Sequence, residues 1–184
     1  MKNILEYKTD FINLVLNTKE KIILDFKQQL SKKEHKEHLS SSEWEMFIKK
    51  SSLSFLSKFL LARIAEDNEV VKEKLTDKGL KIWKKFSKNI PIYKLVEIAF
   101  RDLERSGKTY TKLYKYTVYD DFRPNVDLVT EMILEFKKYN FANIDAKTIQ
   151  EIYSALYPEE ERKELQEFYV QSPILDYMLK EGEM

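Results

Sequence analysis

The chain has 184 residues, enough for one substantial domain or for a domain and the beginning of another. It contains no cysteine, which excludes disulfides, thiolate metal sites and cysteine catalysis. Three glycines and four prolines are few for this length, and 43% hydrophobic with 34% charged residues favours helices with a buried and a solvated face. No apolar run approaches the ~18 residues of a membrane span, and charges interrupt the N-terminal segment, so we expect a cytoplasmic protein.

The net charge of +1 hides an asymmetry between the two parts of the chain. Residues 1–123 contain 26 Lys and Arg against 18 Asp and Glu, a balance of +8, whereas residues 124–184 contain 6 against 13, a balance of −7. Two interpretations stay open: a basic face for a polyanion or an acidic neighbour, or a chance division of solvated charges.

Long helices are predicted in the first part of the chain. Apolar residues from Ile4 to Leu30 recur at helical spacing and favour one long helix or two shorter ones. Ser42 and Glu45 have the spacing of a capping box and predict the start of the next helix. A broad apolar stripe then indicates a helix that continues to about Glu66 and is buried against more than one neighbour.

Shorter helices follow. Thr76 or Asp77 is expected to cap one of them, Pro91 to open another, and Gly107 to lie where that helix ends. Residues 108–123 are the least helical part, because Thr, Tyr and Val are enriched there, and this composition is compatible with a short strand or an irregular loop.

The remaining helix starts are marked by polar residues. Pro124 and Asn125 are expected to start one helix and Asp145 to cap the next, and the pair Ser172-Pro173 is typical of a first helical turn. The sequence therefore predicts an all-α fold, an irregular multi-helix bundle.

No catalytic or metal-binding residue is expected in this chain. Its sequence has no glycine-rich phosphate loop, no serine elbow and no histidine near a plausible nucleophile. His35 and His38 have HxxH spacing, but two imidazoles do not complete a metal site. The acids of residues 159–161 suit the first turn of a helix, where the macrodipole favours negative charge.

Two basic segments are candidates for contact with nucleic acid. The predicted residues are Lys74, Lys78, Lys81, Lys85, Lys112 and Lys115. The first four would share a face if one helix covered them, and the alternative is solvated surface. The last two alternate with tyrosines, which either stack on bases or lie half-buried with their hydroxyls in water.

Arg63 and Asp67 are four residues apart, which predicts an intrahelical ion pair, although a buried arginine with carboxylates also organises interfaces. They belong to "LSFLSKFLLARIAEDNEV", which ends in an R-x-x-E-D pattern and is followed by "TDKGLKIWKKF" and, later, by "RKELQEFYVQSP". Together these segments resemble the N-terminal helical region of adenine-specific DNA methyltransferases, namely type I modification subunits and fused type IIG restriction-modification enzymes. The resemblance covers about residues 50–180.

The resemblance extends to a cofactor motif near the end of the chain. "RKELQEFYVQSP" is similar to motif X, which precedes the catalytic domain and lines the S-adenosylmethionine pocket. It implies cofactor contacts for Phe168, Tyr169 and Pro173, although Glu167 stands where the family has glycine and Val170 where threonine usually follows. The family's later signatures, a glycine-rich cofactor strand and a paired-proline loop for the flipped adenine, do not occur in this sequence.

The resemblance implies a domain that assists a reaction carried out by a separate catalytic domain. Residues 1–50 would be an N-terminal helical extension, 51–165 a helical bundle domain, and 166–184 the motif X-like segment with the first helix of an absent catalytic domain. Methylating adenine in a duplex requires that the base be flipped out of the stack and that the protein bind the neighbouring phosphates. The expected partners are duplex DNA and the protein's own catalytic domain or a restriction-system specificity subunit, and S-adenosylmethionine would bind the parent enzyme. The alternative is a free-standing helical module that binds a protein.

Overall fold

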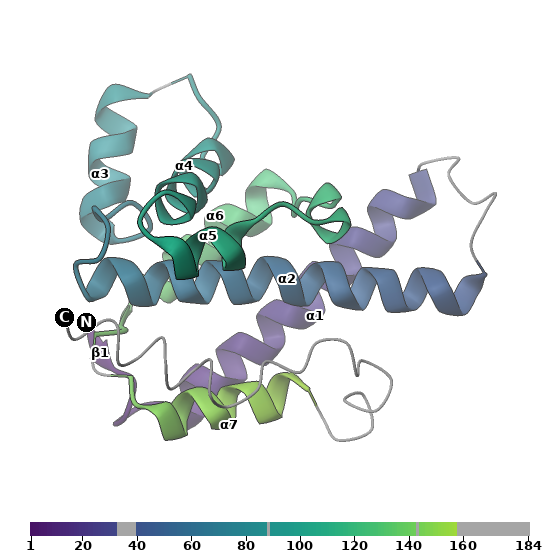
Figure 1. Ribbon diagram of the computed structural model, residues 1–184, viewed down its shortest axis with the longest axis horizontal. Coiled ribbons are helices and arrows are strands. Elements are labelled where there is room, and N and C mark those ends of the chain that lie inside the picture. The colour runs from purple at the N-terminus through teal and green to yellow at the C-terminus, as the bar shows by residue number, and fades with distance from the viewer. Residues whose placement is uncertain (33–39, 88, 143, 158–184) are drawn as a thin grey trace.

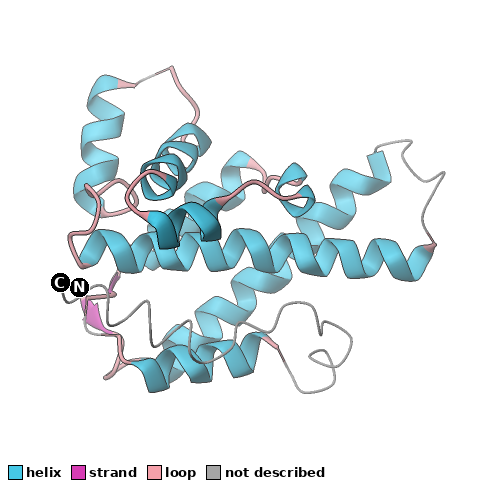
Figure 2. Cartoon of the chain, in the orientation of Figure 1, coloured by secondary structure: helices cyan, strands magenta, loops and turns pink. Residues whose placement is uncertain are grey.

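A computed structural model describes residues 1–32, 40–87, 89–142 and 144–157. These residues form seven α-helices, one short 3₁₀ helix and a pair of two-residue strands (Figures 1 and 2). The predicted all-α multi-helix bundle is confirmed. Within these ranges, no helix is long and apolar enough to cross a membrane.

The two longest helices organise the bundle. Helix α1 spans Lys8–Lys32 and α2 spans Ser41–Asp67. In Figure 1, α2 runs the full width of the view, α1 crosses behind it, and α3 and α4 lie on the side of α2 opposite α7. Because neighbours cover it on several sides, α2 buries most of its circumference between Ile48 and Glu66, as its broad apolar stripe predicts.

Aromatic rings from distant segments meet in the core. Phe136 of α6 packs edge-to-face against Phe11 of α1, at 6.0 Å between ring centroids, and against Phe59 of α2, at 5.6 Å. All three rings are fully buried. Such edge-to-face pairs contribute about 0.5–1.5 kcal/mol each beyond their area burial, so they join α1, α2 and α6 into one core.

The start of α2 differs from the prediction by two residues. Ser40, not Ser42, is the N-cap, and it forms a capping box with Glu43. The Ser40 hydroxyl accepts the backbone N–H of Glu43, and the Glu43 carboxylate accepts the backbone N–H of Ser40 at 2.7 Å. Two serines, Ser40 and Ser42, have a glutamate three residues later, and the structure uses the first of them.

The predicted caps Thr76 and Asp145 are confirmed, and the predicted helix start at Asn125 is also a cap. Thr76 caps α3 (Asp77–Phe86), Asn125 caps α6 (Val126–Phe136) and Asp145 caps α7 (Ala146–Leu156), each through its side-chain oxygen. In each case the oxygen accepts an N–H that the first helical turn leaves unpaired.

Residues 108–123 are more helical than their composition suggests. Helix α4 spans Tyr93–Glu104, and after a short turn α5 spans Lys108–Tyr114, with Gly107 as its N-cap, and the 3₁₀ helix η1 spans Val118–Asp121. Tyr114 packs on Phe100 at 5.3 Å between ring centroids and donates its hydroxyl to the carbonyl of Lys58 at 2.7 Å. These tertiary contacts override the local propensity of the segment.

A small parallel sheet was not predicted. Strand β1, Lys2–Asn3, pairs with β2, Tyr139–Asn140, so that Lys2 lies opposite Tyr139. Two-residue strands are too short to leave an alternating pattern in the sequence. The pairing fixes the chain before α1 beside the segment that follows α6.

The boundary expected at residue 50 falls inside α2, which continues without interruption from Ser41 to Asp67. Four predicted features lie outside the described residues: the histidine pair 35/38, the acids 159–161, the motif X-like segment 166–184 and the helix from Ser172-Pro173.

Candidate nucleic-acid interface

The end of α2 carries a buried ionic cluster. The Arg63 side chain is fully buried, and its guanidinium donates to both carboxylate oxygens of Asp67 at 2.8 and 2.9 Å and to Glu66 at 3.3 Å. The same guanidinium lies over the ring of Phe141, 5.1 Å from its centroid. The predicted intrahelical pair is therefore confirmed.

Both carboxylates of this cluster also accept hydrogen bonds from the backbone of other segments. Glu66 accepts the N–H of Leu75 at 2.9 Å, and Asp67 accepts the N–H of Phe141 at 2.8 Å. Burial raises the pKa of Glu66 to about 7. The cluster thus ties the approach to α3 and the exit from β2 to the end of α2, and it sets where α3 lies.

The four predicted lysines around α3 do not share one helical face. Helix α3 begins at Asp77, so Lys74 lies in the preceding loop. There its ammonium group binds the Asp102 carboxylate at 2.6 Å, and its side chain is only 13% exposed. The other three, Lys78, Lys81 and Lys85, lie on the solvent side of the helix, opposite the buried Leu80.

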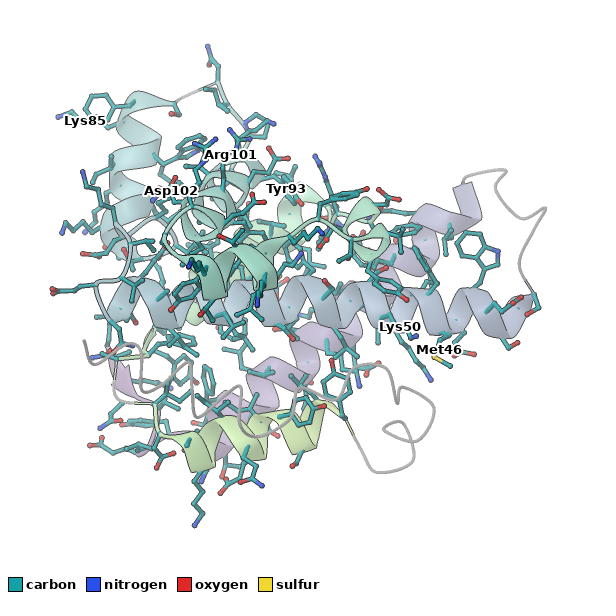
Figure 3. The ribbon with its side chains drawn as sticks, in the orientation of Figure 1. Met46, Lys50, Lys85, Tyr93, Arg101 and Asp102 are labelled. Atoms are coloured by element: carbon teal, nitrogen blue, oxygen red, sulfur yellow. The ribbon has the colours of Figure 1, made fainter. Side chains whose placement is uncertain are left out.

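Ion pairs neutralise two of these three lysines. Lys78 binds Glu73 at 2.9 Å, and Lys81 binds Asp77 at 2.7 Å. Asp77 also accepts from Lys137, and these hydrogen bonds lower the pKa of Asp77 to about 2. Lys85 lies over the ring of Phe86, and it has no carboxylate partner in the part of the chain that the structure describes (Figure 3).

A set of unpaired cations occupies α4 and α5 instead. Its members are exposed and form no ion pair with any described residue: Arg101, Arg105, Lys108, Lys112 and Lys115. We call these five residues the basic α4–α5 surface. Between residues 101 and 115 the chain has only two acids, and one of them, Asp102, is bound to Lys74.

Sequence reasoning found Lys112 and Lys115 in this set and missed the other three. The sequence signal that could have identified these three residues is their spacing. Arg101 and Arg105 are four residues apart, as are Lys108 and Lys112, so each pair shares one side of its helix. The short turn at Gly107 then places the two pairs near each other.

A groove of about 380 Å³ opens beside this surface, between α2, α4, α5 and η1. We call it the aromatic groove. The lining residues that matter below are Tyr93, Glu97, Phe100, Arg101, Glu104 and Tyr116. Tyr93, Glu97 and Arg101 recur every fourth residue of α4, which puts them on one face of that helix, and Figure 3 labels Tyr93 and Arg101 there.

Most of the charge inside the groove is internally paired. Glu97 binds Lys94 at 2.5 Å and Arg123 at 2.7 Å, and Asp120 binds Lys58 at 2.7 Å. Two lining residues remain without an ion pair among the described residues: Arg101 and Glu104.

Two tyrosines of this region differ in their burial. Tyr114 is buried and its hydroxyl is bonded within the fold, which makes it structural. Tyr116 is 64% exposed, and its hydroxyl donates to Asp121. Of these two rings, that of Tyr116 is the exposed one.

The residues available for a metal or cofactor are limited. The described ranges contain no cluster of three or more His, Asp or Glu side chains arranged to hold a metal ion. Phe168, Tyr169 and Pro173, the predicted cofactor contacts, lie outside those ranges.

Comparison with known proteins adds no relative. No protein-family model, no curated protein and no solved structure matches the chain.

Proposed function

We propose that this chain is the N-terminal helical domain, facing DNA or docking to its partners, of an S-adenosylmethionine-dependent adenine-specific DNA methyltransferase of a restriction-modification system. The chain does not transfer methyl groups alone. The methyltransferase assignment rests on the sequence resemblance, and the DNA-facing role rests on the distribution of charge.

The basic α4–α5 surface is the observation that carries the DNA-facing role. A cation that is already bound to a carboxylate gains less from a phosphate, because that ion pair must first be broken. The five members of this surface have no such partner among the described residues, whereas Lys74, Lys78 and Lys81 do. Phosphate contacts supply most of the affinity of a sequence-independent DNA contact.

The buried Arg63 cluster shows what one of the resembling segments does in this fold. The R-x-x-E-D pattern of the sequence is occupied by residues that hold three segments together, so the pattern has a fold-building role. In the parent enzyme, Phe168, Tyr169 and Pro173 would contribute to the S-adenosylmethionine pocket, with the catalytic domain or a specificity subunit as protein partner.

A protein-binding module is the second candidate, and one observation favours it. Ile82, Phe86 and Ile90 are 51%, 74% and 49% exposed on and just after α3. Apolar side chains gathered in this way are typical of a surface that another protein covers.

Binding to duplex DNA at several salt concentrations separates the two candidates. We expect the triple variant Arg105→Gln, Lys108→Gln, Lys112→Gln to bind a short duplex about tenfold more weakly and to reduce the dependence of log Kd on log salt by about 2–3. Fluorescence anisotropy of a labelled duplex between about 50 and 200 mM salt measures both quantities.

The matched control removes three lysines that are already ion-paired. Lys8, Lys21 and Lys138 bind Glu151, Glu131 and Glu135. Changing all three to Gln alters the net charge equally and is expected to weaken binding much less. An equal loss of DNA affinity in both triple variants would contradict the assigned surface. Binding whose affinity does not change with salt concentration would favour the protein-binding module.

The methyltransferase role is tested together with the catalytic domain that the proposal implies. With the catalytic remainder expressed alone and together with this chain, we expect transfer of methyl groups to adenine in duplex DNA to fall when the chain is absent. Unchanged transfer and unchanged DNA affinity would overturn the proposal.

A further inference from the structure

The aromatic groove presents three groups that the fold itself leaves unused. The Tyr93 hydroxyl lines the groove and forms no hydrogen bond with the described residues. The ring of Tyr116 is 64% exposed. The guanidinium of Arg101 has no carboxylate partner among the described residues.

These three groups have the chemistry to bind the base and the phosphate of a nucleotide. An exposed aromatic ring stacks on a base, a free hydroxyl bonds to the polar edge of the base, and a guanidinium binds a phosphate. The volume of the groove, about 380 Å³, lies near the lower end of the ~300–1,000 Å³ typical of small-molecule sites. The groove is therefore large enough for one nucleotide but too small for several consecutive nucleotides of a DNA strand.

We propose that the aromatic groove binds a single unpaired nucleotide of the DNA strand held by the basic α4–α5 surface. The base stacks on Tyr116, the Tyr93 hydroxyl bonds to its edge, and Arg101 binds the adjoining phosphate. This inference rests on the proposed function, because the DNA must first be held on the neighbouring surface.

Continuity with that surface favours a nucleotide over a peptide. Arg101 belongs both to the basic α4–α5 surface and to the lining of the groove, so a strand on the surface passes the opening. Internal pairing neutralises Glu97 and Asp120, and Glu104 is the one lining carboxylate left without an ion pair among the described residues. A phosphate beside Arg101 would be repelled only by Glu104.

The test compares short duplexes that differ in one position. One is fully paired, and the other carries a single unpaired 2-aminopurine, whose fluorescence falls when it stacks on an aromatic ring. We expect the full 184-residue chain to bind the second duplex about tenfold more tightly and to quench its fluorescence. Free deoxyadenosine monophosphate, added as a competitor, should not displace either duplex at comparable concentrations.

Variants of the groove sharpen the test. Tyr116→Ala should abolish the preference for the unpaired base and the quenching while the fully paired duplex still binds. Tyr7→Ala, which removes another exposed tyrosine that does not line the groove, should leave both unchanged. Arg101→Gln should reduce the preference, Glu104→Gln should increase it, and Arg105→Gln, one turn beyond Arg101, should weaken both duplexes equally.

The outcomes separate this inference from the proposed function. Equal affinity for the two duplexes, or quenching that persists in Tyr116→Ala, overturns the groove as a nucleotide site and leaves the DNA surface standing. Displacement of the duplex by free deoxyadenosine monophosphate would show that the groove binds the free mononucleotide. It would overturn the proposal that the bound nucleotide is part of a DNA strand. Failure to bind either duplex at low salt overturns both proposals.

Discussion

Three charged side chains at the end of α2 form a cluster whose members depend on one another. Arg63 neutralises Glu66 and Asp67, and each carboxylate accepts a backbone N–H from another segment. Breaking such a buried pair by removing one partner costs about 3–5 kcal/mol, because the remaining charge stays buried without compensation. The cluster therefore holds its three segments together only while all three residues are present.

Glu66 makes the stability of the fold depend on pH. Burial raises its pKa from 4.5 to about 7 in the folded protein, so the folded state holds this proton more tightly than the unfolded chain. The contribution of Glu66 is fully present below about pH 4.5 and is lost as the pH rises to about 7, a change on the order of 3 kcal/mol. We expect Glu66→Gln to remove this loss. The unfolding free energy of the variant, measured by urea titration, should therefore fall less between pH 4.5 and 7 than that of the unaltered chain.

The neighbouring Glu69 supplies the control. It is exposed, and its carboxylate takes part in no hydrogen bond with the described residues. Glu69→Gln should therefore follow the pH profile of the unaltered chain. Parallel profiles for the unaltered chain and Glu66→Gln would contradict the role of Glu66.

Ion pairs within one helix were predictable and those between helices were not. Arg63 and Asp67 lie one turn apart, so helix geometry alone brings them together. Lys74 and Asp102 are joined by the packing of the loop before α3 against α4, which no local pattern encodes. For this reason the sequence named Lys74 as a DNA contact and did not distinguish it from Lys112, whose charge is free of ion pairs among the described residues.

The position of helix α3 depends on close packing of backbone at its first turn. Gly79 lies so near the loop that a Cβ atom there would come within 2.2 Å of the carbonyl oxygen of Lys74. The N–H of the next residue, Leu75, is held by Glu66, so the loop cannot retreat without disturbing the buried cluster.

Gly79→Ala is expected to destabilise the fold by about 1–3 kcal/mol, because an added methyl group forces backbone apart in a packed region. Gly107→Ala is the matched substitution. A Cβ atom at Gly107 would meet nothing within 4 Å, and the backbone there is extended, so we expect a change below about 1 kcal/mol. Urea unfolding of the two variants measures the difference, and equal losses would contradict the packing argument.

Helices were predicted most accurately where a local signal marks their ends. The caps Thr76, Asn125 and Asp145 each act through one side-chain oxygen three residues from the N–H that it accepts. Helix α5 was not predicted, because Tyr114 is helical through contacts with α4 and α2. Local composition does not contain those contacts.

At the scale of the whole molecule, the first helix is part of the common core. Phe11, Val15, Ile22 and Phe26 of α1 are buried in the same cluster as Phe59 and Phe136. Strand β1, which precedes α1, is bonded to β2, which follows α6. The sequence suggested that residues 1–50 are an extension, because they resemble nothing in the family, but a lack of resemblance does not measure burial.

A fragment that begins at residue 40 tests whether residues 1–50 are an extension or a part of the core. Truncating one large buried apolar side chain costs about 2–5 kcal/mol, and a domain has only about 5–15 kcal/mol in total. The combined cost of removing the buried apolar side chains of α1, which also include Ile23, should therefore exceed the stability of the fold. We expect residues 40–184 to show no cooperative thermal transition by circular dichroism, and addition of residues 1–39 as a separate peptide to restore one. A fragment that melts as sharply as the whole chain would show instead that α1 is dispensable, and that the core closes without Phe11 and Phe26.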